Sequence, residues 1–285
     1  MLKESRLQKN LKLFLNCKDH TVSGELYGVM KNQEYDFLVT SPVPSDLAKY
    51  YQSEDYISHT DAKKSLFDNV YQIVKRHTLK KKVALLNSFL PEQKTVLDIG
   101  AGTGDFLHAC KKDNWKVVGL EPSIKAREIA KSKNVLLEKE LSFFKGQKFD
   151  VITLWHVLEH VENLETYTQS LQELLKENGT LLIAVPNYKS FDASHYGSFW
   201  AAFDVPRHVW HFSQTSIQKI FALVSLKVVQ TLPMKFDAYY VSLLSEKYKN
   251  GKMNILKSFW IGFQSNRKAK RSSEYSSLIY VLKNN

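Results

Sequence analysis

The sequence predicts an α/β protein whose core is a parallel sheet covered by helices on both faces. From residue 95 onward, apolar segments of strand length alternate with segments of helical pattern, which is typical of such a sheet. A second observation is a turn with three glycines, Gly100, Gly102 and Gly104, directly after the first of these strands. The chain of 285 residues, 44% of them hydrophobic, is long enough for one large domain with additions.

The predicted elements follow one another in a regular order. Strands are expected at residues 95–100, 116–121, 134–138, 149–155, 180–186, 226–232 and 277–283. Helices are expected at 61–90, 105–112, 123–133, 164–176 and 214–223. Ser123 is expected to cap the third of these helices, and the fourth is expected to stop near Asn178 and Gly179.

Two regions lie outside this alternation. Residues 1–60 are irregular, with strand-like pieces at 26–29 and 37–39 and a loop rich in proline and serine at 41–46. Residues 234–275 form a long insertion in which basic residues outnumber acids and alternate with aromatics. We therefore expect an N-terminal extension and a main domain at 61–285, whose insertion is a lid over the substrate pocket. An anionic lipid surface or RNA is the alternative partner of this insertion.

The glycine-rich turn has the spacing G-x-G-x-G and is preceded by an acidic residue, Asp98. Glycine permits a positive φ and lets a ligand approach the main chain closely. A second acidic residue, Glu121, ends the next strand, where nucleotide-binding α/β folds hold a ribose. Asp98 would repel the pyrophosphate of a dinucleotide, which needs a helix N-terminus. The pattern instead suits a ligand with a ribose and a cationic amino group, such as S-adenosylmethionine (SAM).

Four segments carry a family resemblance. The sequence resembles the class I SAM-dependent methyltransferases, most closely the group with ubiquinone-biosynthesis-type enzymes, in VLDIGAGTGDF, GLEPS, FDVITLWHVLEHV and LLKENGTLLIAVPN. The resemblance covers residues 61–232 and the terminal strand. It implies a Rossmann-like, seven-stranded, mostly parallel sheet with an antiparallel last strand. It also implies SAM as cofactor and S-adenosylhomocysteine as product.

The resemblance further implies which residues hold the cofactor. They are Asp98, Gly100, Ala101, Gly102 and Gly104 at the methionine end, Glu121 and Pro122 at the ribose, and Trp155 and His156 beside the adenosine or sulfonium. Core packing explains Trp155 equally well, and Glu138 is a weaker candidate for the adenine amine. Tyr56, together with Tyr50 and Tyr51, is expected to reach over the cofactor, although surface packing explains these tyrosines about as well.

The acceptor is expected to bind near the loop at residues 187–213, which follows the carboxyl end of a strand. Methyl transfer needs no protein nucleophile, so the protein orients the acceptor and removes a proton. The candidate catalytic residues are His156, His211 and Arg207. Arg207 either clamps an anionic group of the substrate or pairs with Asp204. The loop's aromatic residues either form a wall for the acceptor or anchor the loop, namely Tyr196, Phe199, Trp200 and Trp210.

A metal site is the sharpest alternative for the histidines. The pattern His156-x-x-Glu159-His160, with His208 or His211, is similar to the E-x-x-E-H motif and later histidine of small-RNA 3′-end methyltransferases. Those enzymes use a divalent ion to hold ribose hydroxyls, and this chain has His156 where their motif has Glu. In the other interpretation, Glu159 and His160 cap the next helix and His156 faces the pocket alone. The prediction is that no metal is bound.

The N-terminal segment resembles a region that precedes this domain in related bacterial methyltransferases. There a cysteine and D-x-x-V-S-x-E are followed by a cysteine pair, which indicates a small zinc ribbon. Here Cys17 and residues 19–25 remain, but the later pair is absent. We therefore expect a metal-free remnant that acts as a lid. The other cysteine, Cys110, completes no disulfide framework, which fits a reducing compartment.

The expected function is SAM-dependent transfer of a methyl group to an O, N or C acceptor on a small molecule or lipid intermediate. An RNA- or protein-modifying methyltransferase and a non-catalytic SAM-binding protein are the alternatives. The net charge of +11 can attract RNA or anionic lipid, but lysine dominates and no arginine-rich tract occurs. A small-molecule or lipid substrate is therefore favoured over nucleic acid. Without a long apolar run or a signal sequence, a cytoplasmic location is expected.

Overall fold

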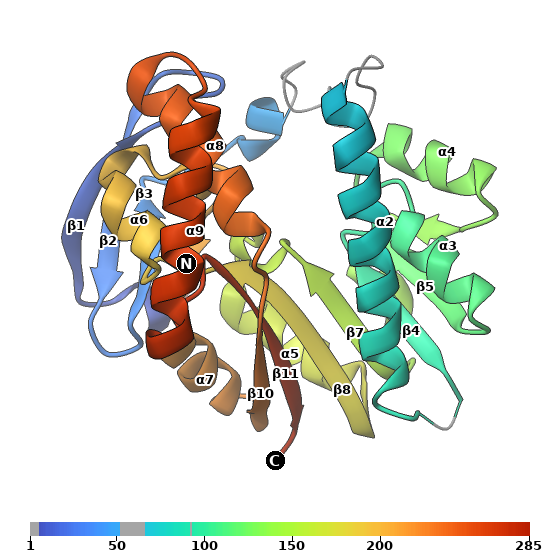
Figure 1. Cartoon of the computed structure of the whole chain (residues 1–285). Helices are drawn as coiled ribbons and strands as arrows, with labels where there is room; N and C mark the ends of the chain where they lie inside the picture. The colour runs from blue at the N-terminus through green and yellow to red at the C-terminus, as the bar shows by residue number, and fades with distance from the viewer. Residues whose placement is uncertain (1–5, 52–65, 92) are drawn as a thin grey trace.

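The computed structural model describes residues 6–51, 66–91 and 93–285. This part of the chain forms two sheets, a larger one built from strands of the second half and a smaller one built mainly from N-terminal residues (Figure 1).

The larger sheet has seven strands in the described residues, in the order β10-β11-β8-β7-β4-β5-β6. Their bounds are β4 Thr95–Ile99, β5 Lys116–Leu120, β6 Leu137–Glu138, β7 Phe149–Trp155, β8 Leu175–Pro186, β10 Leu226–Pro233 and β11 Ser277–Asn284. Strands β4 to β8 pair in parallel, whereas β11 is antiparallel to both β8 and β10. The predicted Rossmann-like sheet with an antiparallel last strand is therefore confirmed.

Helices cover both faces of the larger sheet, as Figure 1 shows. Val96 and Val151 point to the face covered by α2 (Leu66–Asn87), α3 (Asp105–Lys112) and α4 (Ile124–Ser132). Their neighbours Leu97 and Ile152 point to the face covered by α5 (Leu164–Glu173) and α7 (Gln214–Ala222). Because both faces are buried, these strands are nearly continuous apolar runs in the sequence.

Several element boundaries differ from the prediction, among them the end of α2, which lies at Asn87 rather than at residue 90. Helix α5 ends at Glu173 rather than at residue 176, because Leu175 already pairs with Phe149 in the sheet. Asn178 and Gly179 therefore lie inside β8, beside an irregularity in its pairing, and do not end a helix. The predicted strand at 134–138 is reduced to β6, at the edge of the sheet. At Ser123 the prediction is confirmed, since its hydroxyl accepts from the Ala126 N–H.

The smaller sheet contains four described strands, in the antiparallel order β1-β2-β3-β9. They are β1 Leu11–Lys18, β2 Leu26–Asn32, β3 Phe37–Ser41 and β9 Trp210–His211. The sequence did not predict β1, in which Leu13 and Phe14 are 59% and 46% exposed. Strand β9 comes from the loop after β8, so this loop is built into the N-terminal sheet.

The insertion forms a pair of helices, α8 (Asp237–Asn250) and α9 (Ile255–Ser272), which pack against α6 (Phe191–Tyr196). In Figure 1 this pair of helices lies next to the smaller sheet. The buried carboxylate of Asp192 on α6 accepts hydrogen bonds from the side chains of Trp200, Ser265 and Ser276. This carboxylate thus joins the loop, α9 and the start of β11.

The short 3-10 helices are η1 Arg6–Gln8, η2 Leu47–Tyr51, η3 Leu141–Phe144, η4 Leu158–His160, η5 Gly197–Phe199 and η6 Ala201–Phe203.

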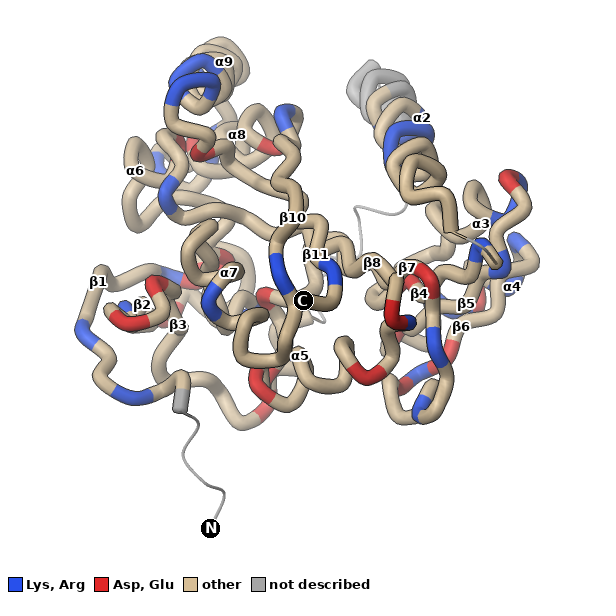
Figure 2. Tube along the Cα trace, turned by 90° about the horizontal axis from the view of Figure 1, so that it is seen from below, with Lys and Arg blue, Asp and Glu red and all other residues tan. Residues whose placement is uncertain are grey.

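Basic residues are spread over the fold rather than gathered on one element. Figure 2 shows Lys and Arg on α2, on α9 and on the outer strands, interspersed with acids elsewhere. None of the described helices has the length and apolar character required to cross a bilayer.

Candidate cofactor and acceptor site

The glycine-rich turn follows β4 and opens α3, and its three glycines have φ values of 71°, 53° and 74°. A side chain on Gly100 would overlap Val157, and one on Gly104 would lie 2.9 Å from the Ala130 side chain. At Gly102, by contrast, an added Cβ would meet nothing within 4 Å among the described atoms. Two of the glycines therefore serve packing, while Gly102 borders open space where a ligand can approach the backbone.

Glu121 lies at the end of β5 and faces the turn. Its carboxylate accepts the Gly102 N–H and the Ser123 N–H, each at 2.9 Å. Arg127 donates to the carbonyl oxygens of Glu121 and Pro122, both at 2.7 Å, and so fixes the backbone here. Each carboxylate oxygen keeps acceptor capacity after one bond, so Glu121 can still accept from two hydroxyls.

Asp98 is buried under the turn, with 2% of its surface exposed, and accepts a hydrogen bond of 2.6 Å from the Thr153 hydroxyl. Burial raises the pKa of Asp98 to about 7, although the Thr153 hydrogen bond and the charge of Lys82 oppose this shift. A buried carboxylate of this kind is stabilised by a cationic ligand.

Lys82 reaches this region from α2, and the sequence did not single it out. Its ammonium lies 4.0 Å from the ring centroid of Trp155, and its pKa falls to about 8 because burial outweighs the attraction of Asp98 and Asp237. The Trp155 ring packs edge-on against Phe106, while its buried indole N–H has no partner in the described residues. Trp155 thus combines core packing with a free donor beside the turn, and Lys82 shows that a cation is accommodated there.

His156 directly follows β7 and adopts φ 58°. Its Nε2 lies 3.1 Å from Asp237 at the start of α8, and its Nδ1 lies 3.4 Å from Glu159. Burial alone would lower the pKa of His156, but pairing with Asp237 and Glu159 raises it to about 10. The side chain is therefore an imidazolium at neutral pH, held between the larger sheet and the insertion.

A cavity of about 590 Å³ begins at His156 and extends between the smaller sheet, the loop and α8. Its polar side includes Glu159, Asp204 and His208, and its apolar side comes mainly from α8. The remaining lining residues include His20, Thr21, Pro186, Tyr240, Val241, Leu244, Tyr248, Met253 and Ser277. The volume and the mixture of apolar walls with a few polar groups are typical of small-molecule sites. The insertion therefore lines the pocket, as a lid would.

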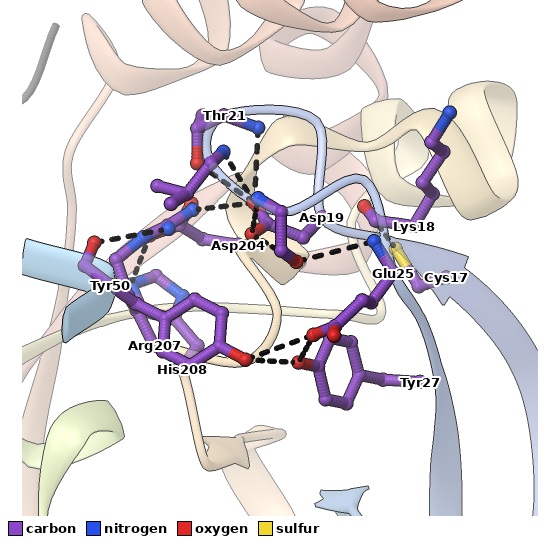
Figure 3. A network of polar contacts seen from close by, with 12 residues as sticks. Cys17, Lys18, Asp19, Thr21, Glu25, Tyr27, Tyr50, Asp204, Arg207 and His208 are labelled. Carbon is purple, nitrogen blue, oxygen red and sulfur yellow. Dashed lines mark hydrogen bonds and ion pairs between the residues drawn. The ribbon is translucent and has the colours of Figure 1, made fainter. Parts of the chain in front are cut away.

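Arg207 is buried and committed to other protein groups (Figure 3). Its Nε and Nη2 donate to the two oxygens of Asp204 at 3.0 and 2.5 Å, and Nη2 also contacts Asp19 at 3.4 Å. Its Nη1 donates to the carbonyl of Tyr50 at 3.4 Å. Of the two interpretations of Arg207, the structure therefore shows the pairing with Asp204, although Arg207 is also among the residues that line the cavity.

His211 lies in β9, outside the cavity. Its Nε2 is 3.1 Å from the Thr40 hydroxyl, and burial together with the charge of His208 lowers its pKa to about 3. The expectation that His211 handles a substrate proton is therefore not supported by its position. Trp200 and Trp210, predicted as wall or anchor, are 1% exposed and anchor the loop.

Three side chains from η4 and the following loop come together at the cavity edge. Glu159, His160 and His208 each place one potential ligand atom within 4.8 Å of the others. Pairing with His156 and the nearby histidine charges outweigh burial and lower the pKa of Glu159 to about 2, and burial and His208 lower that of His160 to about 4. His156 contacts Glu159 but is not part of this group.

The tyrosines that were expected to reach over the cofactor, Tyr50, Tyr51 and Tyr56, do so in none of the contacts among the described residues. Tyr56 lies outside the described residues. Tyr50 donates to Glu25, and the Tyr51 hydroxyl lies 2.9 Å from His160 Nδ1, so both belong to the wall between the smaller sheet and the loop. Cys17 is a free, buried thiol that donates to the Ser198 carbonyl at 3.1 Å, and it is in no metal-type group among the described residues.

Sequence reasoning missed Lys82 and Asp237 as site residues. Lys82 is one of several lysines on a long helix, and only the tertiary fold shows which of them turns inward. Asp237 opens a helix of the insertion, and no spacing in the sequence relates it to His156. The sequence did predict the site residues that directly follow a strand, namely Glu121 and His156.

Comparisons with known proteins agree with this geometry. A family model described as a methyltransferase domain matches residues 69–231. The ubiquinone biosynthesis O-methyltransferase of Histophilus somni is 31% identical over 110 residues, which are 33% of this chain and 46% of that protein. The human mitochondrial ubiquinone biosynthesis O-methyltransferase is 26% identical over 163 residues, 50% of this chain and 44% of that protein. The chain thus spans less than half the length of these two relatives.

Solved structures share the fold at low sequence identity. Magnesium protoporphyrin IX methyltransferase from Synechocystis PCC 6803, solved with bound S-adenosylhomocysteine, has a TM-score of 0.55 at 15% identity and covers 83% of this chain and 97% of its own. A putative sarcosine dimethylglycine methyltransferase from Galdieria sulphuraria has a TM-score of 0.50 at 13% identity, with 74% and 85% covered. The family model spans more than half of the 285 residues, and so the chain belongs to the methyltransferase-domain family, as its resemblance to the SAM-dependent methyltransferases predicted.

Proposed function

We propose that this chain transfers a methyl group from SAM to an O, N or C acceptor on a small molecule or lipid intermediate. The observation that carries the proposal is that a cavity of about 590 Å³ is lined by His156, whose neighbour Val157 packs against Gly100 of the turn suited to SAM. The family membership supports the reaction, while the acceptor is inferred from the cavity alone.

The residues around the turn fit SAM. The open space at Gly102 admits a ligand to the backbone, the buried carboxylate of Asp98 attracts the amino group, and Glu121 keeps acceptor capacity for the ribose hydroxyls. The unpartnered indole N–H of Trp155 is a further donor beside the turn. Bound SAM would supply a methyl group on a cationic sulfonium, which is open to in-line attack.

The protein's part in the reaction is to hold and orient the acceptor. Apolar side chains of α8 line the cavity, and the polar groups that can fix orientation come from η4 and the loop and also from Asp237 and Lys247 of α8. Of the three predicted catalytic residues, we retain His156, because it lines the cavity and its neighbour Val157 packs against Gly100 of the turn. As an imidazolium His156 cannot take the acceptor's proton, which leaves to solvent water, but its positive charge lowers the energy of an acceptor oxygen that becomes anionic. Arg207 and His211 hold the loop in place.

The proposal is tested with purified protein, methyl-labelled SAM, and lipid and small-metabolite extracts. We expect label in a small organic product, and none with the Gly102→Arg variant, whose side chain fills the space at the turn. Label that enters only added RNA or protein would contradict the small-molecule assignment. SAM binding without transfer to any acceptor would instead identify a non-catalytic binding protein. A cytoplasmic location of the protein stays a prediction.

A further inference from the structure

Glu159, His160 and His208 are held together by the backbone rather than by mutual side-chain bonds. Glu159 and His160 belong to η4, and the Val209 N–H donates to the Glu159 carbonyl at 2.8 Å, which brings the loop with His208 against this helix. The His208 carbonyl also accepts the Thr40 hydroxyl at 2.6 Å. The three side chains are thus placed before any ligand arrives.

The Glu159 carboxylate has an unusual environment. It is 1% exposed, and within the described part of the chain neither of its oxygens receives a hydrogen bond. The nearest cation is His156, whose Nδ1 is 3.4 Å away and whose other nitrogen faces Asp237. The His156 imidazolium offsets part of the cost of burying this carboxylate, and the oxygens of Glu159 keep lone pairs that can bind a further cation.

The two histidine rings are oriented by carbonyl oxygens. His160 Nδ1 lies 3.0 Å from the Arg207 carbonyl, and His208 Nδ1 lies 2.9 Å from the Ala202 carbonyl. A carbonyl only accepts, so these contacts favour a proton on each Nδ1 and an Nε2 lone pair that can bind a ligand. This is the arrangement in which backbone groups fix the tautomer of metal-binding histidines. The Tyr51 hydroxyl, 2.9 Å from His160 Nδ1, can accept from the same proton, and His208 Nε2 lies 3.9 Å from the Asp204 carboxylate.

We propose that Glu159, His160 and His208 bind a divalent transition-metal ion of the zinc class, with an open coordination position toward the acceptor cavity. Metal binding itself goes beyond the proposed function and does not depend on it. The further role of the ion, to hold an oxygen of the acceptor, rests on the proposed methyl transfer.

The donor set determines the class of ion. Two imidazole nitrogens and one carboxylate are typical of zinc and related transition-metal sites that keep a position for water or substrate, whereas magnesium prefers oxygen ligands and keeps its waters. Ligand atoms around tetrahedral zinc are roughly 3.3 Å apart, given bond lengths near 2.0 Å. The three potential ligand atoms now lie within 4.8 Å of one another, so the side chains must move closer together when the ion binds.

The proposed ligand set differs from the motif considered in the sequence. His156 is held by Asp237, and His211 by Thr40, so neither completes the group. His208, which the sequence offered only as one of two later histidines, is the residue that does.

The proposal is tested by titrating chelator-treated, full-length protein with Co²⁺ in the absence of SAM and acceptor. We expect binding of one ion per chain, visible absorption bands from cobalt with nitrogen ligands, and displacement by Zn²⁺. Glu159→Gln and His208→Gln are each expected to weaken Co²⁺ binding at least about 100-fold, because loss of an outer partner alone costs 10–100-fold. His195→Gln, which changes an exposed histidine of α6, is the matched control and should bind as the wild type does.

Circular dichroism establishes which variants are folded, and His160→Gln serves as a third variant if one of the others is not. The proposal is overturned if the wild type shows no cobalt bands at 1:1 stoichiometry, or if folded ligand variants bind Co²⁺ as tightly as His195→Gln does. Since no methyl transfer is measured, these outcomes are independent of the proposed function. A metal-binding protein without transferase activity would retain the site and refute only the reaction.

Discussion

Asp98 combines a binding role with a cost to the fold. Among the described residues, its buried carboxylate accepts a hydrogen bond from the Thr153 hydroxyl and has Lys82 as a nearby cation, and burial raises its pKa to about 7. The group that attracts the cofactor is therefore one whose ionisation the protein alone disfavours. Binding and stability are linked through this one side chain.

SAM affinity should rise severalfold, at most about tenfold, between pH 6 and pH 7.5, because Asp98 ionises in this window and attracts the amino group. Calorimetric titration at constant ionic strength measures it. The window ends at pH 7.5, since an α-amino group itself loses its proton at roughly pH 7.7–8.0. Asp98→Asn should bind SAM weakly with a flat profile; an equally flat profile in the wild type would contradict this role.

The same shift predicts how the cofactor-free protein responds to pH. Between the ordinary pKa of 3.8 and about 7, folded Asp98 retains a proton that the unfolded chain releases. Its contribution to the free energy of unfolding is therefore greatest below 3.8 and is lost as pH rises to about 7. Asp98→Asn lacks this loss, so urea unfolding should show the variant gaining stability relative to wild type from pH 5 to pH 8.

Glu121→Ala should weaken SAM binding by about 100-fold or more, because two charge-assisted hydrogen bonds to the ribose, at about 1.5–3 kcal/mol each, are lost. Glu128→Ala changes an exposed carboxylate on α4 and is the matched control. Isothermal titration of both variants decides the matter: equal affinities would show that Glu121 serves only the Gly102 and Ser123 backbone.

At the scale of elements, the insertion is joined to the site by the close contact of its two helices. At Gly262 of α9 a Cβ would lie 2.7 Å from the Tyr239 ring and 2.9 Å from the Tyr239 Cα on α8. Because backbone atoms cannot swing aside, the distance between these helices depends on the glycine. Helix α8 in turn carries Asp237 and one wall of the cavity.

Gly262→Ala should separate α8 from α9 and cost about 1–3 kcal/mol of stability, as overpacked interfaces do. Denaturant unfolding measures the cost, and Lys270→Ala on the exposed side of α9 should leave it unchanged. SAM binding should persist in the Gly262 variant, because α8 and α9 pack mainly against each other and against α6 rather than against β4 or α3. A variant as stable as the wild type would show that the helices are free to shift.

Elements with a strong local pattern were predictable, and those defined by distant partners were not. The strands with both faces buried were found, as was the Ser123 cap. Strand β1 was missed because the consecutive apolar residues Leu13 and Phe14 are both exposed at an irregularity in its pairing, which removes the alternation that marks a half-buried strand. In the site, the turn and Glu121 could be predicted, whereas Lys82 and Asp237 depend on tertiary placement.

At the scale of the whole molecule, Arg207 fastens the N-terminal sheet to the loop after β8. Figure 3 shows its guanidinium between Asp19, which precedes β2, and Asp204 of the loop. Asp19 also accepts the backbone N–H groups of Thr21 and Ser23, so the arginine connects two rigid turns. The N-terminal extension is thereby part of the cavity wall.

Arg207→Met should lower the free energy of unfolding by about 3–5 kcal/mol, because buried Asp19 and half-buried Asp204 would lose their cation. Arg267→Met, at an exposed position of α9, controls for loss of a positive charge. Urea unfolding at neutral pH measures both variants. A stable Arg207 variant that loses only acceptor binding would restore the role of substrate clamp.

The position of β11 also sets the order in which the site can be completed during synthesis. This strand comes last in the chain order of the larger sheet, yet it lies between β8 and β10, and its Ser277 pairs with Pro186 where both border the cavity. The cofactor turn is positioned by β4, β5 and β7, and its formation requires no residue of β11. On the ribosome, the half of the site that receives the methyl donor can therefore assemble first, and the half that receives the acceptor closes only when this strand inserts.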